Sequence, residues 1–572
     1  MSERRYGLRF YALVAGFGCI TLAAFVQGVL PMLEPQSRST KVTRVVRTDV
    51  GELKWIEYNS TDYTPLQQHG RRVYTKEGCW YCHSQYVRPV TGETRRWGPV
   101  TQAGEYAFDL PHLFSTRRIG PDLSRVGLKY SDAWHLAHFW DPRMLTPDSI
   151  MPRFSAMFDG PYQAKTVTDD AKGVHTLEKT PATEKLFNFD AAEQLLLTPN
   201  ADGLVYVPQR GKYPVIFTPN QEYEGEVVTL VSDTEDLKGL VAYLQKLGIN
   251  RGKWRDRFEP QLMEAAQVSI PRSEEWIAYG KQVYGRRCEG CHGVKGDGNG
   301  PAAAFMQNDR PRNFTLGVFK FRLTPSGSLP DDGDLLRTIT RGVRGTAMPP
   351  WHELLEKDRL AVIQYVKYEL SADRSDPAKP YFYFAEEPLR PPIYIGLPPA
   401  PSAELLERGE AAWKEAKCWE CHGEGGKGDG EKAPGLKDDF GFPIPPANLT
   451  TGQFKSGAGV KDIFRTMSTG LSGTPMPSYM QTVSEEDRWA LSYYVLSLSA
   501  YTDPLTGEKL QIPEADRAAL NDPATVATES HYAYKLEAAG QPTYYAGEAW
   551  AKKHGFDFAA ARAGAERQPD WR

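Results

Sequence analysis

The sequence has no cysteine to spare for disulfide bonds. Only seven cysteines occur in 572 residues, and six of them fall into three Cys-x-x-Cys-His pentapeptides. The seventh, Cys19, lies in an apolar segment, where it is expected to pack as a small hydrophobic side chain. A scaffold held together by disulfides is therefore excluded, and the cysteine sulfurs are assigned to chemistry instead.

The sequence also lacks a concentration of positive charge. Its 68 Lys and Arg residues are balanced by 72 Asp and Glu residues, for a net charge of -4. Because binding to a phosphate backbone needs a concentrated cationic face, nucleic acid is not expected as a partner. A mean hydropathy of -0.50 excludes a protein that lies mostly within a bilayer, and the length predicts about three to four globular domains.

One segment carries no charge at all. Phe10 to Leu30 form a run of 21 uncharged residues, which as a helix spans about 30 Å, the thickness of a hydrocarbon core. A cleaved signal peptide has an apolar region of about 7–15 residues followed by a small-residue cleavage site, and residues 31–35 offer no such site. We therefore expect a retained single-pass anchor, whose orientation the flanking basic residues leave open.

The three pentapeptides predict covalent haem attachment. Two thiols three residues apart can form thioethers with the two vinyl groups of one haem, and the adjacent His then ligates the iron. A zinc site would need two such pairs close together, whereas these lie more than one hundred residues apart. We predict three haem c groups, bound by Cys79, Cys82 and His83, by Cys288, Cys291 and His292, and by Cys418, Cys421 and His422.

A Met-Pro dipeptide follows each pentapeptide after 68, 56 and 54 residues, respectively. Proline keeps the preceding residue extended and stiffens the loop, so the thioether can be presented to the iron. The predicted second iron ligands are Met151, Met348 and Met476. The neighbouring methionines that compete with them lack the following proline: Met144, Met157, Met306, Met467 and Met480. His/Met ligation raises the reduction potential, which suits the oxidising end of a respiratory chain.

Other side chains near the first pentapeptide give weaker predictions. His135 and His138 lie three apart on an expected helix that begins near Ser131, and they are alternative ligands, although surface packing or a contact to a haem propionate is the favoured interpretation. A ligating His normally donates its second ring N–H to a carbonyl. Pro121 is the expected acceptor for His83, and Pro311 and Pro434 are weaker candidates for His292 and His422.

The second and third pentapeptides belong to an internal repeat. Cys288 to Cys418 spans 130 residues, and Met348 to Met476 spans 128. Helices are expected before the second and third Cys pairs and again near 236–247, 355–370 and 485–499, and a few strands within 160–233. A further helix is expected near 545–565.

The predicted fold is mainly α: one N-terminal transmembrane helix followed by three class I cytochrome c domains, with a small β-containing insertion in the first. The expected parts are an anchor and stalk (1–50), cytochrome domain 1 (51–250, with the insertion 160–233), domain 2 (270–372), a linker (373–401), domain 3 (402–500) and a tail (501–572).

Five segments around the first pentapeptide form an extended string of specific residues. They are KEGCWYCHSQ (76–85), RRIGPDLSRVG (117–127), KYSDAWH (129–135), DPR (141–143) and SIMP (149–152). Together they resemble the membrane-anchored mono-haem subunit of cbb3-type cytochrome c oxidases. The two later domains are similar to generic class I cytochromes c, and their order suggests the dihaem partner subunit of such oxidases. In that family the two subunits are usually separate chains, and the insertion has no recognised counterpart.

The resemblance implies a tri-haem cytochrome that passes electrons to a separate polytopic subunit, which holds haem b and copper and reduces oxygen to water. With one apolar helix and scattered histidines, this chain is expected to have no oxygen-reducing site of its own. A donor such as a soluble or membrane-bound cytochrome c would reduce the outer haems, and electrons would leave through the haem on His83 and Met151. Because haem c is attached outside the cytoplasmic membrane, the haem domains are expected on the periplasmic side of a bacterial inner membrane.

Three alternatives stay open at this point. The chain could be the electron-donating cytochrome c subunit of a nitric oxide reductase of the haem-copper superfamily, whose catalytic subunit has non-haem iron in place of copper. It could also be a free-standing anchored multihaem carrier without a polytopic partner. A redox or gas sensor is disfavoured, because no signalling domain follows and each iron has two predicted ligands.

Overall fold

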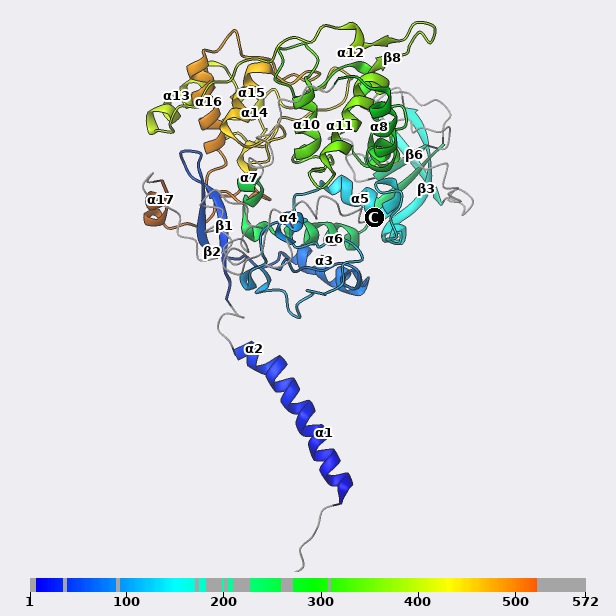
Figure 1. Ribbon diagram of the computed structural model, residues 1–572, viewed down its shortest axis with the longest axis vertical. Coiled ribbons are helices and arrows are strands. Elements are labelled where there is room, and N and C mark those ends of the chain that lie inside the picture. Colours follow the sequence, from blue (N-terminus) through cyan, green and yellow to red (C-terminus); the bar gives the residue numbers. More distant parts are fainter. Residues whose placement is uncertain are drawn as a thin grey trace, which may run out of the picture.

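An apolar helix projects from a larger, mainly helical body (Figure 1). The computed structural model describes residues 7–33, 39–88, 93–169, 174–181, 198–199, 204–208, 227–258, 271–306 and 310–521. Helices dominate, and a small sheet accompanies them, so the predicted fold class is confirmed. The helix expected near 545–565 lies outside the described residues.

The projecting helix is α1 (Leu8–Ala24), which continues through the π-helical turn η1 (Phe25–Val29) into α2 (Leu30–Leu33). The stretch Arg9–Gln27 is long and apolar enough to cross a membrane, and none of its most apolar window is buried inside the body. Large side chains such as Phe17 (68% exposed) have no protein core to cover them. By length and composition, this helix is therefore suited to a membrane, a property that an uncleaved signal sequence shares.

Three helical units form most of the body, and all are built alike. The first helices of the units are α3 (Pro65–Lys76), α8 (Glu274–Arg287) and α13 (Ala403–Glu415), and the last helices are α6 (Glu235–Lys246), α11 (Glu356–Tyr365) and α16 (Glu485–Ser497). Short helices hold the pentapeptides, at η3 (Cys79–Tyr81), α9 (Glu289–His292) and α14 (Trp419–His422), and the middle helices are α5 (Asp132–Trp140), α10 (Asp332–Arg341) and α15 (Val460–Thr469). The helices expected before the second and third Cys pairs and near 236–247, 355–370 and 485–499 are thus confirmed, with η12 (Val366–Leu370) extending α11.

Each first helix begins at a hydroxyl residue. The side chains of Thr64, Ser273 and Ser402 accept hydrogen bonds from the backbone N–H three residues further on. These bonds satisfy donors that a helix start leaves without an intrahelical partner, so the sequence itself fixes where the helices begin.

The first and last helices of each unit cross in close contact. The crossing point is a glycine, at Gly70, Gly280 and Gly409, which lie nine, eight and nine residues before the first cysteine. A Cβ atom at these positions would overlap the backbone carbonyl oxygens of Gly239, Ala361 and Ala490, respectively. Because backbone cannot move aside as a side-chain tip can, only glycine allows this approach.

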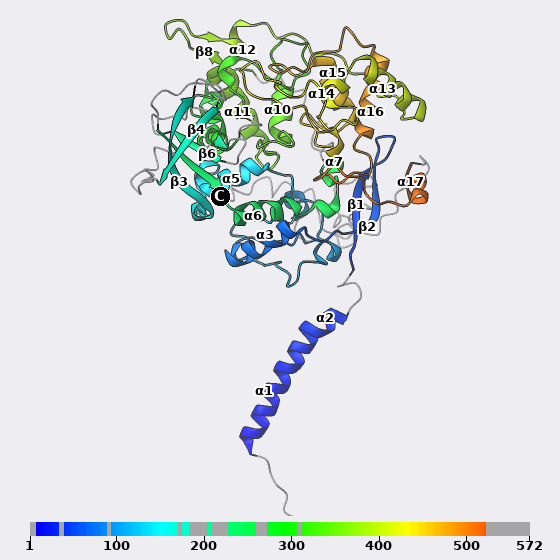
Figure 2. The same cartoon turned by 180° about the vertical axis from the view of Figure 1, so that it is seen from behind.

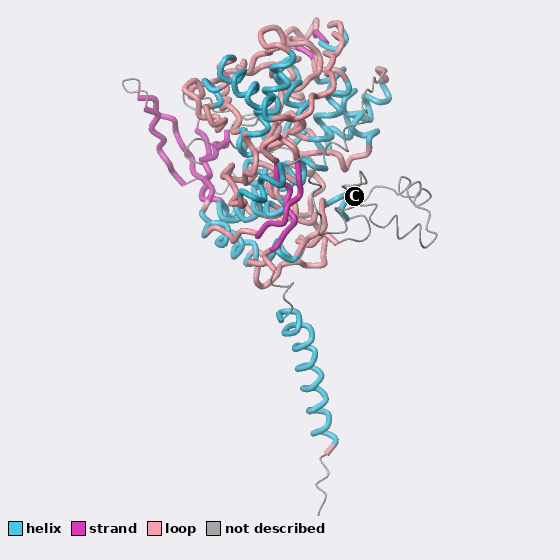
Figure 3. Tube along the Cα trace, turned by 90° about the vertical axis from the view of Figure 1, so that its left-hand side faces the viewer, coloured by secondary structure: helices cyan, strands magenta, loops and turns pink. Residues whose placement is uncertain are grey.

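The strands expected within 160–233 are present. A sheet of order β4-β3-β7-β6-β5 is formed by β3 (Phe158–Asp169), β4 (Val174–Pro181), β5 (Thr198–Pro199), β6 (Leu204–Pro208) and β7 (Val227–Asp233). All its pairings are antiparallel. It stands at one side of the body (Figure 3) and enters and leaves the first unit between the Met151 loop and α6.

A two-stranded hairpin links the first unit to the third. Strand β1 (Lys41–Arg47) pairs with β2 (Leu53–Asn59) across the predicted boundary at residue 50. Arg47 donates to Asp256, in the short helix α7 (Trp254–Phe258), at 3.3 Å and to the carbonyl oxygen of Ala458 at 3.0 Å. Strand β1 is therefore buried against the body, and this burial comes from contacts with segments far away in the sequence.

The segments predicted as linker and tail also make defined contacts. A small ladder joins β8 (Ala372–Asp373) to β9 (Tyr381–Phe382), and in α12 (Tyr383–Glu386) Phe384 packs into the core of the second unit. After the third unit, Tyr501 is buried with Val46 of β1, close to α17 (Glu514–Asn521). The domain boundaries themselves stay predictions.

The helix crossing gives a first test. Ala usually stabilises an exposed helix by about 1 kcal/mol relative to Gly, but Gly280→Ala is expected to lower the free energy of unfolding by about 1–3 kcal/mol, because the new methyl group overlaps the carbonyl of Ala361. In the same helix, a Cβ at Gly285 would meet only the flexible end of Glu289. Gly285→Ala is therefore the matched control and should be neutral or stabilising in thermal or urea unfolding. Equal effects of the two substitutions would contradict the close crossing.

Candidate haem sites

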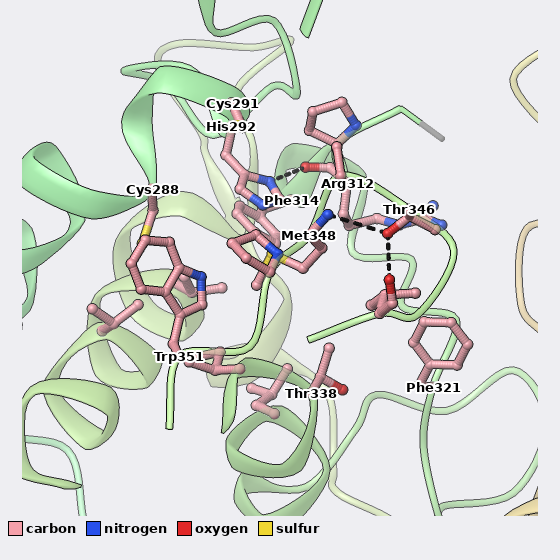
Figure 4. Close-up of a pocket in the computed structure, with 18 of the residues that line it drawn as sticks. Cys288, Cys291, His292, Arg312, Phe314, Phe321, Thr338, Thr346, Met348 and Trp351 are labelled. Carbon is pink, nitrogen blue, oxygen red and sulfur yellow. Dashed lines mark hydrogen bonds between the residues drawn. The ribbon is translucent and has the colours of Figure 1, made fainter. Parts of the chain in front are cut away.

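In the second unit, the four predicted residues line one crevice. Cys288, Cys291, His292 and Met348 all face a cavity of about 1300 Å³, measured to its open mouth, and Figure 4 shows His292 and Met348 reaching into it. Most of the other lining side chains are apolar, including Phe314, Leu335 and Trp351. A mostly apolar cleft with a few polar groups is typical of a cofactor site.

The third unit repeats this arrangement. Cys418, Cys421, His422 and Met476 line a second apolar crevice of about 1380 Å³. His422 lies close to Trp413 of α13, with ring centroids 6.0 Å apart. The two crevices thus combine paired thiols, one imidazole and the predicted methionine in the same relative order along the chain. Each is also lined by one of the competing methionines, Met306 in the second and Met467 in the third.

In the first unit, the predicted residues gather around the core. Cys79 and Met151 both pack against the main apolar cluster of the unit. His138 lies at the same site, and its Nε2 is 3.1 Å from the Sδ atom of Met151. His135 is buried at 2% exposure and makes no contact with Met151 among the interactions of the described residues.

In all three predicted ligand histidines, Nδ1 forms a hydrogen bond with a backbone carbonyl oxygen. His83 bonds to the carbonyl oxygen of Pro121 at 2.8 Å, as expected. His292 instead bonds to Arg312 at 3.0 Å and His422 to Ala447 at 3.3 Å, so the predictions of Pro311 and Pro434 are wrong.

The physical reason is a turn that follows each acceptor. The next residues are Asp122, Asn313 and Asn448, and each side chain accepts the backbone N–H two residues further on, at 2.9, 2.9 and 3.0 Å. Such an Asx turn fixes the direction of the preceding carbonyl. The repeated Asn-x-Thr at 313–315 and 448–450 was the signal in the sequence that identifies Arg312 and Ala447.

The chain must pass very close to the first of these rings. A Cβ atom at Gly120 would overlap the imidazole of His83. Glycine at this position lets the Gly120-Pro121 segment lie against the ring, so that the Pro121 carbonyl reaches Nδ1.

The imidazoles are suited to bind a metal ion. Burial lowers the pKa of His292 to about 4, while the bond to the Arg312 carbonyl acts in the opposite direction. Burial likewise lowers the pKa of His83 and of His422. The rings are therefore neutral near pH 7, and with Nδ1 donating to a carbonyl, the Nε2 lone pair is left for the iron.

A hydroxyl group orders each methionine loop. The backbone N–H groups of Met151, Met348 and Met476 donate to the side chains two residues earlier, at 3.3, 3.2 and 3.2 Å. These hydroxyl residues are Ser149, Thr346 and Thr474. In the two outer loops the same hydroxyl also donates to a carbonyl, that of Val343 or Leu471. The sequence contains this Ser/Thr-x-Met-Pro pattern, but sequence reasoning did not assign it a role.

The three sites lie in series. Lys320, Phe321 and Lys455 line both the second and the third crevice, so these two cavities share a wall. The second pentapeptide in turn touches the first unit: a Cβ at Gly290 would overlap the carbonyl oxygen of Met144.

An apolar bridge completes the contact between the first and second units. Cys291 and Ala347 belong to the same apolar cluster as Cys79 and Met151. Phe158 and Phe305 meet edge to face across this contact, with centroids 6.4 Å apart. The second unit therefore adjoins both the first and the third.

The residues present fit haem c on the chemistry of their donor sets. Two crevices offer a pair of cysteines for thioether bonds, an imidazole with its Nδ1 already satisfied, and two methionine thioethers, of which only Met348 and Met476 precede a proline, in a mostly apolar lining. The first site holds the same residue types.

Comparison with known families agrees with this geometry. Residues 49–250 match the family described as cytochrome C oxidase, mono-heme subunit/FixO, residues 277–366 match cytochrome C oxidase, cbb3-type, subunit III, and residues 406–499 match cytochrome c. The protein is therefore a multihaem c-type cytochrome, an electron carrier with covalently bound haem c. More particularly, it is a FixO-like cytochrome that carries further cytochrome c domains in the same chain.

A solved structure also matches part of the chain. It is a reducing HAO-like protein complex of Kuenenia stuttgartiensis, 42% identical over 40% of this chain and 99% of that one, and its TM-score is 0.36. No curated protein matches the chain.

The methionine loops give a second test. Thr346→Val keeps the side-chain shape but removes the acceptor of the Met348 N–H and the bond to Val343. We expect a loss of about 1–3 kcal/mol in the free energy of unfolding, since a buried N–H is left without a partner, together with a weaker near-infrared Fe–S charge-transfer band from the second haem. Thr338→Val is the control, because Thr338 lines the same crevice but bonds only within α10, to Asp334. An unchanged band in Thr346→Val would show that the hydroxyl does not order the loop.

Proposed function

We propose that this chain is the electron-transfer subunit of a cbb3-type terminal oxidase, with three haem c groups in one polypeptide. The observation that carries the proposal is the series of three sites, the first of which lies in the FixO-like region and the second in the region similar to subunit III. In this proposal a separate polytopic subunit with haem b and copper receives the electrons and reduces oxygen.

The proposed path enters at an outer crevice and leaves through the first unit. When bound, each haem supplies one-electron redox chemistry between ferrous and ferric iron. The chain's own residues set the path: the shared wall at Lys320, Phe321 and Lys455 keeps the outer crevices adjacent, and the contact of Gly290 with Met144 keeps the second close to the first. Neutral His and Met ligands favour the reduced form and hence a high potential.

The apolar helix supports membrane attachment. Helices α3 and α6 of the first unit lie at the end of the body nearer to α1 and α2 in both views (Figures 1 and 2). In our proposal α1 is a single-pass anchor in a bacterial inner membrane, with the haem units on the periplasmic side. This arrangement would bring the first haem closest to a membrane-embedded acceptor and leave the outer units accessible to a donor such as a soluble or membrane-bound cytochrome c.

The direct test is the composition of the protein extracted from membranes in mild detergent. We expect three haem c per chain, as the three pentapeptides require, together with a polytopic chain that contains haem b and copper. Non-haem iron in place of copper would indicate nitric oxide reduction instead. Haem c without any partner chain would contradict both and leave a free-standing anchored carrier.

Substitution of the first methionine tests the ligand assignment. Met151→Ala removes the thioether that we assign to the first iron, so we expect the potential of that haem to fall and its Fe–S band to disappear, with the outer haems unchanged. Met157→Ala is the matched control, because Met157 packs against the same apolar cluster as Met151 and lies only six residues further along the chain. A potential unchanged by Met151→Ala in a redox titration would refute the assignment.

A further inference from the structure

His138 lies beside Met151 in the first unit, although the predicted ligands of the first iron are His83 and Met151. It lies on α5, and its ring stacks on Trp134 one turn earlier, with centroids 4.6 Å apart and planes at 16°. Trp134 stacks in turn on Tyr130 at 3.8 Å and 12°. Because this column of aromatic rings holds the imidazole in one orientation, its two nitrogens point in fixed directions.

The two nitrogens of His138 have different surroundings. Nε2 lies 3.1 Å from Sδ of Met151, within hydrogen-bond distance for sulfur. Nδ1 is buried and has no hydrogen-bond partner among the described residues. A thioether sulfur carries no hydrogen and can only accept, so a hydrogen bond here requires that Nε2 carries the proton.

The outer crevices lack an equivalent group. Among the residues that line them, the second contains no histidine other than His292, and the third none other than His422. The additional imidazole therefore distinguishes the first site from two sites that otherwise repeat its ligand pattern.

We propose that His138 is a positioning residue that donates its Nε2–H to the sulfur of Met151 and thereby raises the potential of the first haem. The positive end of the N–H dipole faces the ligand sulfur, so it disfavours the added positive charge of ferric iron and favours ferrous iron. Electrons collect at the haem of higher potential, which gives the series a direction toward the first unit. This inference rests on the proposed function, because it assumes a haem iron bound to Met151.

The test compares aromatic substitutions within α5 in the intact holoprotein. His138→Phe keeps an aromatic ring against Trp134 and removes the N–H. At a fixed applied potential, the ferric-to-ferrous ratio of the first haem should rise roughly three- to tenfold, the equivalent of one ordinary hydrogen bond, while the outer haems do not change. His138→Gln retains an N–H donor and should recover part of the shift.

His135→Phe is the matched control. His135 lies on the same helix, is buried, and contacts Tyr130 and Phe139. This substitution should leave the ferric-to-ferrous ratio of the first haem as it is in the unsubstituted protein. A shift as large as that of His138→Phe would mean that general packing of α5, and not the bond to sulfur, sets the potential, and it would overturn the inference.

The remaining outcomes separate this inference from the proposed function. If Met151→Ala lowers the potential but neither His138→Phe nor His138→Gln changes it, the role of His138 is refuted while the ligand assignment stands. If the first haem of the unsubstituted protein lacks the Fe–S band and gives a spectrum of two imidazole ligands, which His138→Phe abolishes, His138 is itself the iron ligand and the inference is overturned. If His138→Phe does not fold, His138→Gln takes its place in the test. A potential of the first haem as low in His138→Gln as in Met151→Ala would likewise overturn the inference.

Discussion

The contact between the first and last helix of each unit is the constraint on which the three sites depend. Each pentapeptide follows directly after the first helix, and in the outer units the methionine loop directly precedes the last helix. When the two helices cross at a glycine, both walls of the crevice are brought together at once. A single close backbone contact thus unites a Cys-x-x-Cys-His segment with a methionine more than fifty residues away. In the first unit the sheet is inserted between the methionine loop and α6, and α3 and α6 still cross in close contact.

Buried charges then fix how the units lie relative to one another. Asp256 accepts from Arg47 of the hairpin and also pairs with Arg344, which follows α10 of the second unit. Arg44 pairs with Asp503, after the third unit, at 2.9 Å. Buried ion pairs add little net stability, since desolvation offsets their attraction, but breaking one partner is costly. We interpret this network as a device that fixes the spacing of the sites, and electron transfer between them depends on that spacing.

Local sequence predicted the parts of this protein that are defined by local chemistry. The pentapeptides, the Met-Pro dipeptides and the helices that flank them all depend on residues close together in the chain. The predictions of Pro311 and Pro434 as acceptors for His292 and His422 are wrong, because an Asx turn, and not a proline, determines the direction of the carbonyl. The contact of His138 with Met151, the wall shared by the outer crevices and the burial of the hairpin depend on residues far apart in sequence, and no local pattern predicts them.

In the proposed function, electrons leave the chain through the first unit. The most direct measurement follows the three haem c groups after the fully reduced membrane complex is mixed rapidly with oxygen, with single methionine variants used to assign each spectrum. We expect the haem on His83 and Met151 to be oxidised first and the outer haems to follow in the order second, then third. Oxidation of an outer haem before the first would contradict it.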